Sequence, residues 1–296
     1  MTSHISTILA VGAAGKCAGL VVPELVRRGV KVRGLIRDAK QGDEVRKHGA
    51  AEVVVGDLRD RASLDAVLKG VDSVFYIAPA FIPDEAQIGK AMVDAAKKAG
   101  VRRFVFSSVI HPTLYALENH SAKGPVEEAI LESDMEYAIL HPAMFFQNFA
   151  ATWPTVVKTG VFSEPWSLDT HFSRVDYRDV AEVAAIALTE QRLMFGTYEL
   201  CAEGDLNRKD VAALMGVVLK KRAEAAKLTP VNGSGTSKNS SDGKQVSPIE
   251  RMFQWYDNHG LLGNPLVLRA ILVREPRTLR AYFEELAAEP GGNGDS

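Results

Sequence analysis

TILAVGAAGKCAG, at residues 7–19, joins a short apolar run to a glycine-rich turn and an apolar-periodic segment that continues through Leu25. A strand, a glycine turn and a helix in this order begin a dinucleotide-binding βαβ unit. Gly12 permits the tight turn, Gly15 lets the backbone approach a pyrophosphate, and Ala18 lets helix and strand pack closely. The phosphates would lie on free N–H groups at the helix N-terminus. The spacing is Gly-x-x-Gly-x-x-Ala rather than Gly-x-Gly-x-x-Gly, so an ordinary glycine turn of an α/β protein is the alternative.

The composition is that of an ordinary globular protein, with 46% hydrophobic and 24% charged residues in a chain of 296. A net charge of −2 favours neither a nucleic-acid nor a membrane partner. No apolar run approaches the roughly 20 residues that cross a bilayer, and the N-terminus lacks the basic start of a secretory signal. Cys17 and Cys201 are too few for a disulfide framework or a metal cluster. We therefore expect a cytoplasmic protein without a metal.

Short apolar runs alternate with longer helical patterns over the first half of the chain. The runs predict strands at residues 8–11, 30–36, 52–55, 73–77, 104–106 and 137–140. Helices are expected between them at residues 18–28, 40–48, 62–68, 85–99 and 121–131. This alternation is typical of a doubly wound parallel sheet. The sequence thus predicts an α/β fold whose Rossmann domain spans residues 1–150.

The pattern loosens after residue 150 and predicts a smaller, mixed C-terminal substrate lobe over residues 151–289. Helices are expected at residues 145–153, 180–188, 208–227, 249–258, 265–272 and 277–288, with Asp179 and Asn207 as N-caps of the second and third, and a strand at 198–201. Residues 229–248 contain almost nothing apolar and predict a flexible insertion. Residues 290–296 read as a disordered tail.

The residues that follow each strand are the candidates for cofactor binding, because ligands of open α/β sheets lie beyond the carboxyl ends of the strands. Arg37, with Lys40 close behind, predicts NADP(H) in preference to NAD(H), since a guanidinium pairs with the extra 2′-phosphate. A solvated loop arginine is the alternative, and we expect the neighbouring Asp38 to point away. Asp57 suits the adenine amino group or, equally, the N-cap of the next helix, with Leu58 as an apolar wall.

The glycine turn and the later strand ends complete the predicted cofactor site. Small or imino residues at positions 78 and 79 suit a chain that passes close to a ribose, and the serines after residue 106 lie towards the nicotinamide. The full predicted set is Gly12, Ala14, Gly15, Lys16, Cys17, Ala18, Arg37, Lys40, Asp57, Leu58, Ala78, Pro79, Ser107, Lys123 and Pro142.

Lys123 and Ser108 are the candidate catalytic residues. A lysine at the start of a helix can bind the nicotinamide ribose hydroxyls, and its charge can lower the pKa of a neighbouring hydroxyl. A tyrosine four residues before this lysine would complete the Tyr-x-x-x-Lys acid of the short-chain dehydrogenases, but Asn119 stands there and an amide cannot deliver a proton. Three residues are candidates for replacing the phenol, although each suits a structural role better: His111, Tyr115 and His120.

Eight segments together resemble the NmrA-like family of atypical short-chain dehydrogenase/reductases. They are residues 12–15, 37–38, 56–58, 104–108, 120–128, 140–148, 175–181 and 274–279. The resemblance implies an NADP(H)-binding Rossmann domain and a smaller lobe that closes over the nicotinamide. Ala18 departs from the family's third glycine, and His141 stands where many members carry arginine. The family includes reductases with a lysine at the Lys123 position and also redox sensors or co-regulators that turn nothing over.

Aromatic residues that follow the last strand of the first half predict a pocket for a flat or apolar small molecule. The candidate pocket residues are His111, Phe145, Phe146, Asn148, Trp153, Trp166 and Phe172. For each aromatic residue the alternative is a place in the core between the two lobes. We therefore expect an NADPH-dependent reductase of a small apolar or aromatic carbonyl, quinone or enone. The alternative is a non-catalytic NADP(H)-sensing regulator with a protein partner, and a homodimer is left open.

Overall fold

A seven-stranded parallel sheet forms the centre of the protein, whose computed structural model describes residues 7–228 and 246–289. The strand order is β10-β6-β5-β4-β1-β2-β3, so the direction of winding reverses between β1 and β4. The strands are β1 (Thr7–Val11), β2 (Lys31–Ile36), β3 (Glu52–Val55), β4 (Ser73–Ile77), β5 (Arg103–Ser107), β6 (Glu136–Pro142) and β10 (Gly196–Leu200). The predicted doubly wound Rossmann sheet is confirmed.

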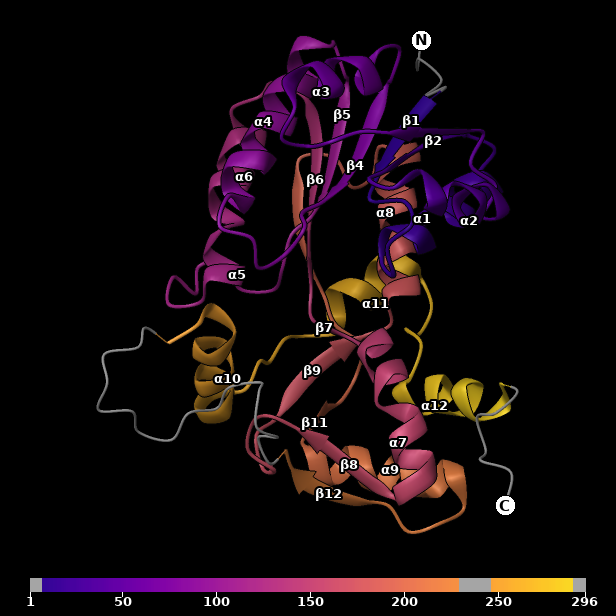
Figure 1. Ribbon diagram of the computed structural model, residues 1–296, viewed down its shortest axis with the longest axis vertical. Helices are drawn as coiled ribbons and strands as arrows, with labels where there is room; N and C mark the ends of the chain where they lie inside the picture. Colours follow the sequence, from indigo (N-terminus) through magenta and orange to yellow (C-terminus); the bar gives the residue numbers. More distant parts are fainter. Residues whose placement is uncertain (1–6, 229–245, 290–296) are drawn as a thin grey trace.

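Helices cover both faces of this sheet (Figure 1). One face carries α1 (Ala18–Arg27) and α8 (Tyr177–Thr189), and the other carries α3 (Arg61–Leu68), α4 (Glu85–Lys98) and α6 (Gly124–Leu131). In β1, Ile8 and Ala10 pack on the first face while Leu9 and Val11 pack on the second. The run is therefore apolar at every position rather than at alternate ones, as is usual for a strand buried on both sides.

A smaller lobe lies beyond the carboxyl ends of the strands (Figure 1). Its strands are β7 (Met144–Phe145), β9 (Phe172–Val175) and β11 (Asp205–Leu206) in one sheet, and β8 (Val161–Glu164) and β12 (Glu224–Lys227) in another. Its helices are α7 (Trp153–Thr159), α9 (Arg208–Leu219), α10 (Pro248–His259) and α12 (Leu279–Ala288), whereas α11 (Leu266–Leu272) packs on α8 and β10 of the large sheet. Helix α8 and strand β10 pack into the seven-stranded sheet and its helices, which we call the large layer. The large layer therefore includes residues beyond the predicted boundary at residue 150.

Several predicted helix boundaries were wrong. The helix at 208–227 ends at Leu219, because Lys220 adopts a left-handed conformation (φ 52°) and the chain then forms β12. The helix at 121–131 is two helices, α5 (Glu118–Ser121) and α6, with Pro125 in the first turn of α6. The helix at 145–153 is a 3₁₀ segment (Phe146–Ala151) followed by α7. The strands β8 and β9 lie where the sequence pattern loosened.

The segment after β2 also differs from the prediction. Two short segments, the 3₁₀ turn Ala39–Gln41 and α2 (Gly42–Lys47), replace the single polar helix predicted after β2. Residues 229–245 of the predicted insertion and the predicted tail at 290–296 lie outside the described residues. Within the part of the chain that is described, no helix is long and apolar enough to cross a membrane.

Candidate cofactor and active site

A cavity of about 400 Å³ opens at the carboxyl ends of β1, β2, β3 and β4. It lies where the strand order reverses, which is the usual ligand position in an open α/β sheet. The predicted cofactor residues in its lining are Gly12, Gly15, Lys16, Cys17, Ala18, Arg37, Asp57, Leu58, Ala78 and Pro79. The predicted residues outside the lining are Ala14, Lys40, Ser107, Lys123 and Pro142. Arg59, Ile82 and Ile88 also line the cavity and were not predicted.

The turn between β1 and α1 requires glycine at two positions. Gly12 has a φ of +70°, and the Gly15 N–H donates to the Gly12 carbonyl at 2.7 Å. A Cβ on Gly15 would lie 3.0 Å from that carbonyl oxygen. Cys17, which precedes α1, supplies no side-chain cap to the helix. A phosphate on the free N–H groups would take the place of such a cap.

Arg37 lines the cavity from the end of β2, and it has no hydrogen-bond or ion-pair partner within the described residues. The neighbouring Asp38 carboxylate accepts the Lys40 backbone N–H at 3.0 Å and thereby caps the 3₁₀ turn. Asp38 is absent from the cavity lining. The unpaired charge that β2 contributes to the cavity is therefore positive.

Asp57 lines the cavity beyond β3 and does not cap the helix that follows. The N-cap of α3 is Asp60, whose side chain accepts the Ala62 N–H. Asp57 instead accepts the Arg59 N–H at 2.9 Å, in a turn that keeps its carboxylate at the mouth of the cavity. Arg59 reaches across the mouth to Asp84 through two hydrogen bonds of 2.7 and 2.9 Å. Leu58 supplies an apolar wall beside them.

Lys123 is held in a buried ion pair with Glu85 at the start of α4. Lys123 is 5% exposed and Glu85 is 2% exposed. Burial raises the pKa of Glu85, and the charge of Lys123 opposes that rise. An ion pair in this position fixes the lysine at the carboxyl side of β5, close to the face that carries α4 and α6. Lys123 was predicted as a site residue, whereas its partner Glu85 was not.

Two serines at the end of β5 point to opposite faces of the sheet. Ser107 Oγ and Tyr177 Oη are 2.9 Å apart and buried beneath α8. Ser108 Oγ donates to Glu127 Oε1 at 2.5 Å on the α6 side. Glu127 also binds His141 Nε2, at 2.9 Å. Tyr177 and Glu127 were not predicted as site residues, although both lie in segments that carried the family resemblance.

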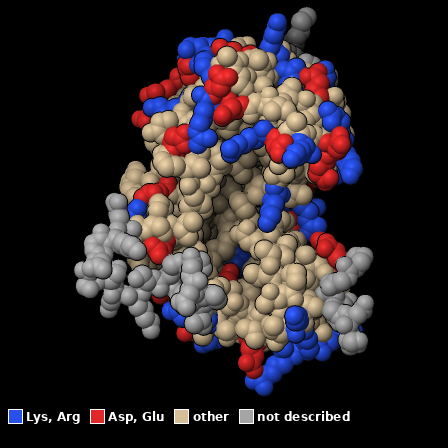
Figure 2. Space-filling model, viewed as in Figure 1, with Lys and Arg blue, Asp and Glu red and all other residues tan. Residues whose placement is uncertain are grey.

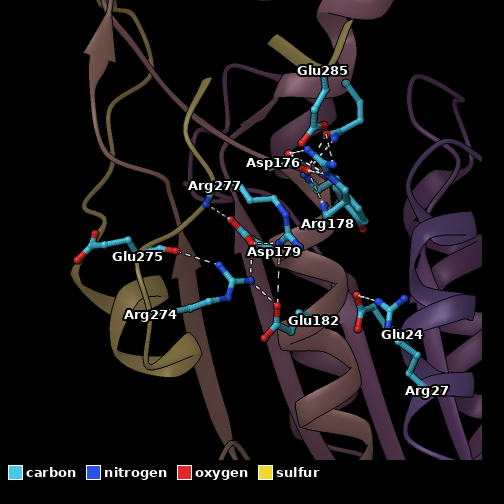
Figure 3. A network of polar contacts seen from close by, with 12 residues as sticks. Glu24, Arg27, Asp176, Arg178, Asp179, Glu182, Arg274, Glu275, Arg277 and Glu285 are labelled. Atoms are coloured by element: carbon cyan, nitrogen blue, oxygen red, sulfur yellow. Dashed lines mark hydrogen bonds and ion pairs between the residues drawn. The ribbon is translucent and has the colours of Figure 1, made fainter. Parts of the chain in front are cut away.

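The start of α8, which carries Tyr177, is tied to the C-terminal part of the chain. Figure 3 shows Arg274 and Arg277 converging on Asp179 in the first turn of α8. Asp179 also accepts the Arg277 backbone N–H at 2.7 Å. The sequence predicted Asp179 as the N-cap of this helix. That prediction was wrong, because the N-cap is Asp176. The second aspartate is instead the anchor for the segment around residue 277.

The candidates for replacing the phenol do not meet at one place. His120 is fully buried between Tyr256 Oη (3.0 Å) and the His111 carbonyl (3.2 Å), and burial lowers its pKa to about 4. The His111 ring binds the Leu262 carbonyl at 2.7 Å. Tyr115 is 79% exposed. These environments suit structural or surface residues rather than a proton donor.

The aromatic candidates lie mainly in the core. Phe146 and Trp153 pack in one cluster of the smaller lobe, where Trp153 stacks on Phe283 at 5.4 Å. Trp166 and Phe172 lie 4.8 Å apart in another cluster. Phe145 differs, because its ring contacts that of Tyr177 at 4.8 Å near Ser107. Asn148 is exposed. Burial of these four aromatic rings favours the core alternative for them.

The surface is hollowed between the carboxyl edge of the sheet and the smaller lobe (Figure 2). The visible walls of this hollow are mostly uncharged, in contrast to the charged outer surface of the large layer. Among the described residues, no cluster of histidine, cysteine and carboxylate side chains has a geometry that would hold a metal ion.

A family model described as the NmrA-like family matches residues 4–283. The chain belongs to the NmrA-like family. The NAD(P)H azoreductase of Xenophilus azovorans is 30% identical over 223 residues, which are 75% of this chain and 77% of that protein. The quinone oxidoreductase 2 of Escherichia coli is 23% identical over 208 residues, 70% of this chain and 72% of that protein.

Solved structures of NADP(H) complexes share the fold of this NmrA-like protein. The NADPH-dependent quinone oxidoreductase of Escherichia coli, complexed with NADPH, has a TM-score of 0.78 at 20% identity and covers 93% of this chain and 98% of its own. The triphenylmethane reductase of Citrobacter sp., complexed with NADP(H), has a TM-score of 0.78 at 18% identity, with the same coverage of 93% and 98%. Similarity at this identity shows the shared fold.

Proposed function

We propose that this NmrA-like protein is an NADPH-dependent reductase of a small apolar or aromatic carbonyl, quinone or enone. The observation that carries the proposal is the cavity at the strand-order reversal, with a glycine turn on one side and an unpaired Arg37 on the other. The residues present fit a dinucleotide phosphate, because Gly12 and Gly15 line the cavity and contribute no side chain to the turn before α1. Arg37 supports NADP(H) in preference to NAD(H), since Asp38 is engaged by the backbone.

NADPH, when bound, supplies the hydride for the reduction. Lys123 lies beyond β5 in an ion pair with Glu85, and in this proposal its Nζ donates to the ribose hydroxyls at the nicotinamide end. Ser108, on the same side of the sheet, offers a hydroxyl that can polarise the acceptor. The acceptor would bind in the hollow between the carboxyl edge of the sheet and the smaller lobe, where it is partly shielded from bulk water. Phe145 is the candidate aromatic residue whose contact with Tyr177 places it beside Ser107.

The acceptor class follows from the uncharged walls and from the relatives. The azoreductase, the quinone oxidoreductase and the triphenylmethane reductase are named for aromatic, conjugated acceptors. A panel of quinones, enones, aromatic ketones and azo dyes therefore covers the chemistry to be tested. NADPH oxidation with at least one of them, at a rate well above the oxidase background, is the expected result.

The control variant must not leave a buried charge unpaired. Replacing Lys123 alone would strand Glu85 in the core, so the matched control is Lys123→Met combined with Glu85→Gln. This pair keeps the volume and removes both charges. We expect it to bind NADPH and to lose turnover.

The alternative function is an NADP(H) sensor that turns nothing over. The residue that favours it is Asn119, which stands where a phenol would complete the acid four residues before Lys123. No turnover with any acceptor of the panel, together with micromolar NADPH binding, would support the sensor. A homodimer or a regulatory protein partner stays a prediction.

A further inference from the structure

Three polar side chains connect β5 and β6 to α6 at the nicotinamide side of the proposed site. Ser108 Oγ donates to Glu127 Oε1 at 2.5 Å, and His141 Nε2 lies 2.9 Å from the same oxygen. Glu127 lies four residues after Lys123, which is about one turn of helix. The connection depends on the strand register, because β5 and β6 pair Ser107 with Leu140 and so bring residue 108 beside residue 141.

Of the three side chains, Ser108 is buried and the other two are partly accessible. Ser108 is 6% exposed, whereas the side chains of Glu127 and His141 are 16% and 15% exposed. The second ring nitrogen of His141 has no hydrogen-bond partner among the described residues. A proton taken from this imidazole can therefore be replaced from water.

We propose that Ser108, Glu127 and His141 form a proton relay that supplies the proton needed after hydride transfer. The relay rests on the proposed reductase function and fills the role that Asn119 cannot perform. Ser108 is the catalytic residue of the three, and Glu127 and His141 act through it.

The proton balance of the step is complete. The hydride from NADPH adds to one atom of the acceptor double bond, and the electron pair of that bond moves to the other atom. This second atom takes the hydroxyl proton of Ser108. For this transfer the Ser108 hydroxyl turns from Glu127 towards the acceptor. The His141 Nε2 proton passes to Glu127 Oε1, the same oxygen passes a proton to Ser108 Oγ, and the second ring nitrogen of His141 takes a proton from water, so each of the three groups ends with as many protons as it began with. The net change is one hydride and one proton added to the acceptor.

The residue types suit this sequence of transfers. A hydroxyl and a carboxylate each accept and donate a proton in turn, and imidazole exchanges protons near neutral pH. The other basic groups nearby are unsuited, because Lys123 is paired with Glu85 and His120 is enclosed by Tyr256 and a carbonyl.

The experiment compares two dyes that differ in their demand for a proton. An azo dye takes up a hydride and a proton to give the hydrazo compound. A cationic triarylmethane dye takes up a hydride alone and becomes neutral. Single-turnover decolourisation of each dye by the NADPH-loaded protein measures the two reactions on one site.

The variants are His141→Arg and Glu127→Gln. Arginine offers N–H donors to Glu127 but releases no proton, and glutamine keeps the hydrogen bonds but cannot carry a proton. We expect azo reduction to slow by about 10- to 100-fold, which approaches the rate loss caused by removing a general acid. Triarylmethane reduction should be unchanged. A solvent deuterium isotope effect should accompany the azo reaction of the unaltered protein and be absent from the triarylmethane reaction.

Each other outcome overturns the relay. Equal slowing of both dyes would indicate a structural role, and unchanged azo reduction in both variants would exclude proton transfer through these residues. An unaltered protein that reduces the cationic dye but no acceptor requiring a proton would refute the relay and leave hydride transfer intact. If the unaltered protein reduces neither dye nor any acceptor of the wider panel, the reductase function fails and the relay fails with it.

Discussion

Arg37→Asp tests which group recognises the extra phosphate of NADP(H). The guanidinium lies in the cavity lining and has no partner within the described residues, so nothing in the protein must be broken before it binds a phosphate. A charge-assisted hydrogen bond contributes about 1.5–3 kcal/mol. Arg37 is exposed, and solvent screening places its contribution at the lower end of that range. About 1.5 kcal/mol corresponds to roughly tenfold in affinity.

The substitution also places a second carboxylate beside Asp38, where it would repel the 2′-phosphate. We therefore expect NADPH binding to weaken by at least about tenfold, with NADH binding little changed. Isothermal titration calorimetry with both cofactors measures the difference directly. Raising the salt concentration should reduce the preference for NADPH in the unaltered protein, because the contact is ionic and exposed.

Arg59→Gln is the matched control for this measurement. Arg59 lines the same cavity, but Asp84 already engages its guanidinium at 2.7 and 2.9 Å. A small and equal change for NADPH and NADH is the expected result. Equal losses for both cofactors in Arg37→Asp would remove Arg37 from the phosphate site, and a selective loss in Arg59→Gln would assign the phosphate to Arg59.

Two further predictions concern buried groups. Glu85→Gln should lower the free energy of unfolding by about 3–5 kcal/mol in urea titrations, because Lys123 would lose its buried partner. Adding Lys123→Met should recover most of the lost free energy. Two additive losses would contradict the pairing. Burial raises the pKa of Cys17 to about 12 from 9.0, so the native thiol ionises later than the unfolded one and stability should fall as pH rises from 9 towards 12. Cys17→Ser should flatten that fall, and an unchanged pH dependence in the variant would refute it.

The residues that line the cavity could largely be predicted from sequence, because their positions depend on local backbone requirements. The strand, glycine turn and helix at residues 7–27 are contiguous in sequence, so their order does not depend on contacts with distant residues. Arg37 and Asp57 were found because each follows directly on a short apolar run. Position at a strand end is fixed once the sheet is parallel.

Residues 224–227 show where local preference was overridden. The sequence around them, RAEAAK, favours a helix, yet these residues form β12, a parallel partner of β8. The hydrogen bonds of Arg208 to the Ala226 carbonyl and of Glu224 N–H to the Gly160 carbonyl hold the strand in place. Neither partner is near in sequence, so no local pattern could indicate the strand.

The aromatic residues after β6 could not be assigned from sequence for a different reason. A ring that walls a pocket and a ring that fills a core have the same local signature, and only their neighbours distinguish them. Trp153 meets Phe283 from the far end of the chain, whereas Phe145 meets Tyr177 beside the site. The same holds for the pairing of Ser108 with Glu127, which the spacing from Lys123 permits but does not specify.

The residues proposed for cofactor selection and for proton delivery lie far apart on the sheet, and this separation has a measurable consequence. Arg37 follows β2 and His141 lies in β6, four strand spacings apart in the order β6-β5-β4-β1-β2, or about 19 Å. Effects of substitutions at such a distance usually add. In the double variant Arg37→Asp with His141→Arg, the loss of NADPH affinity and the slowing of azo reduction at saturating cofactor should therefore equal those of the single variants. A coupling of more than about 0.5 kcal/mol would show that the two proposed sites are not independent.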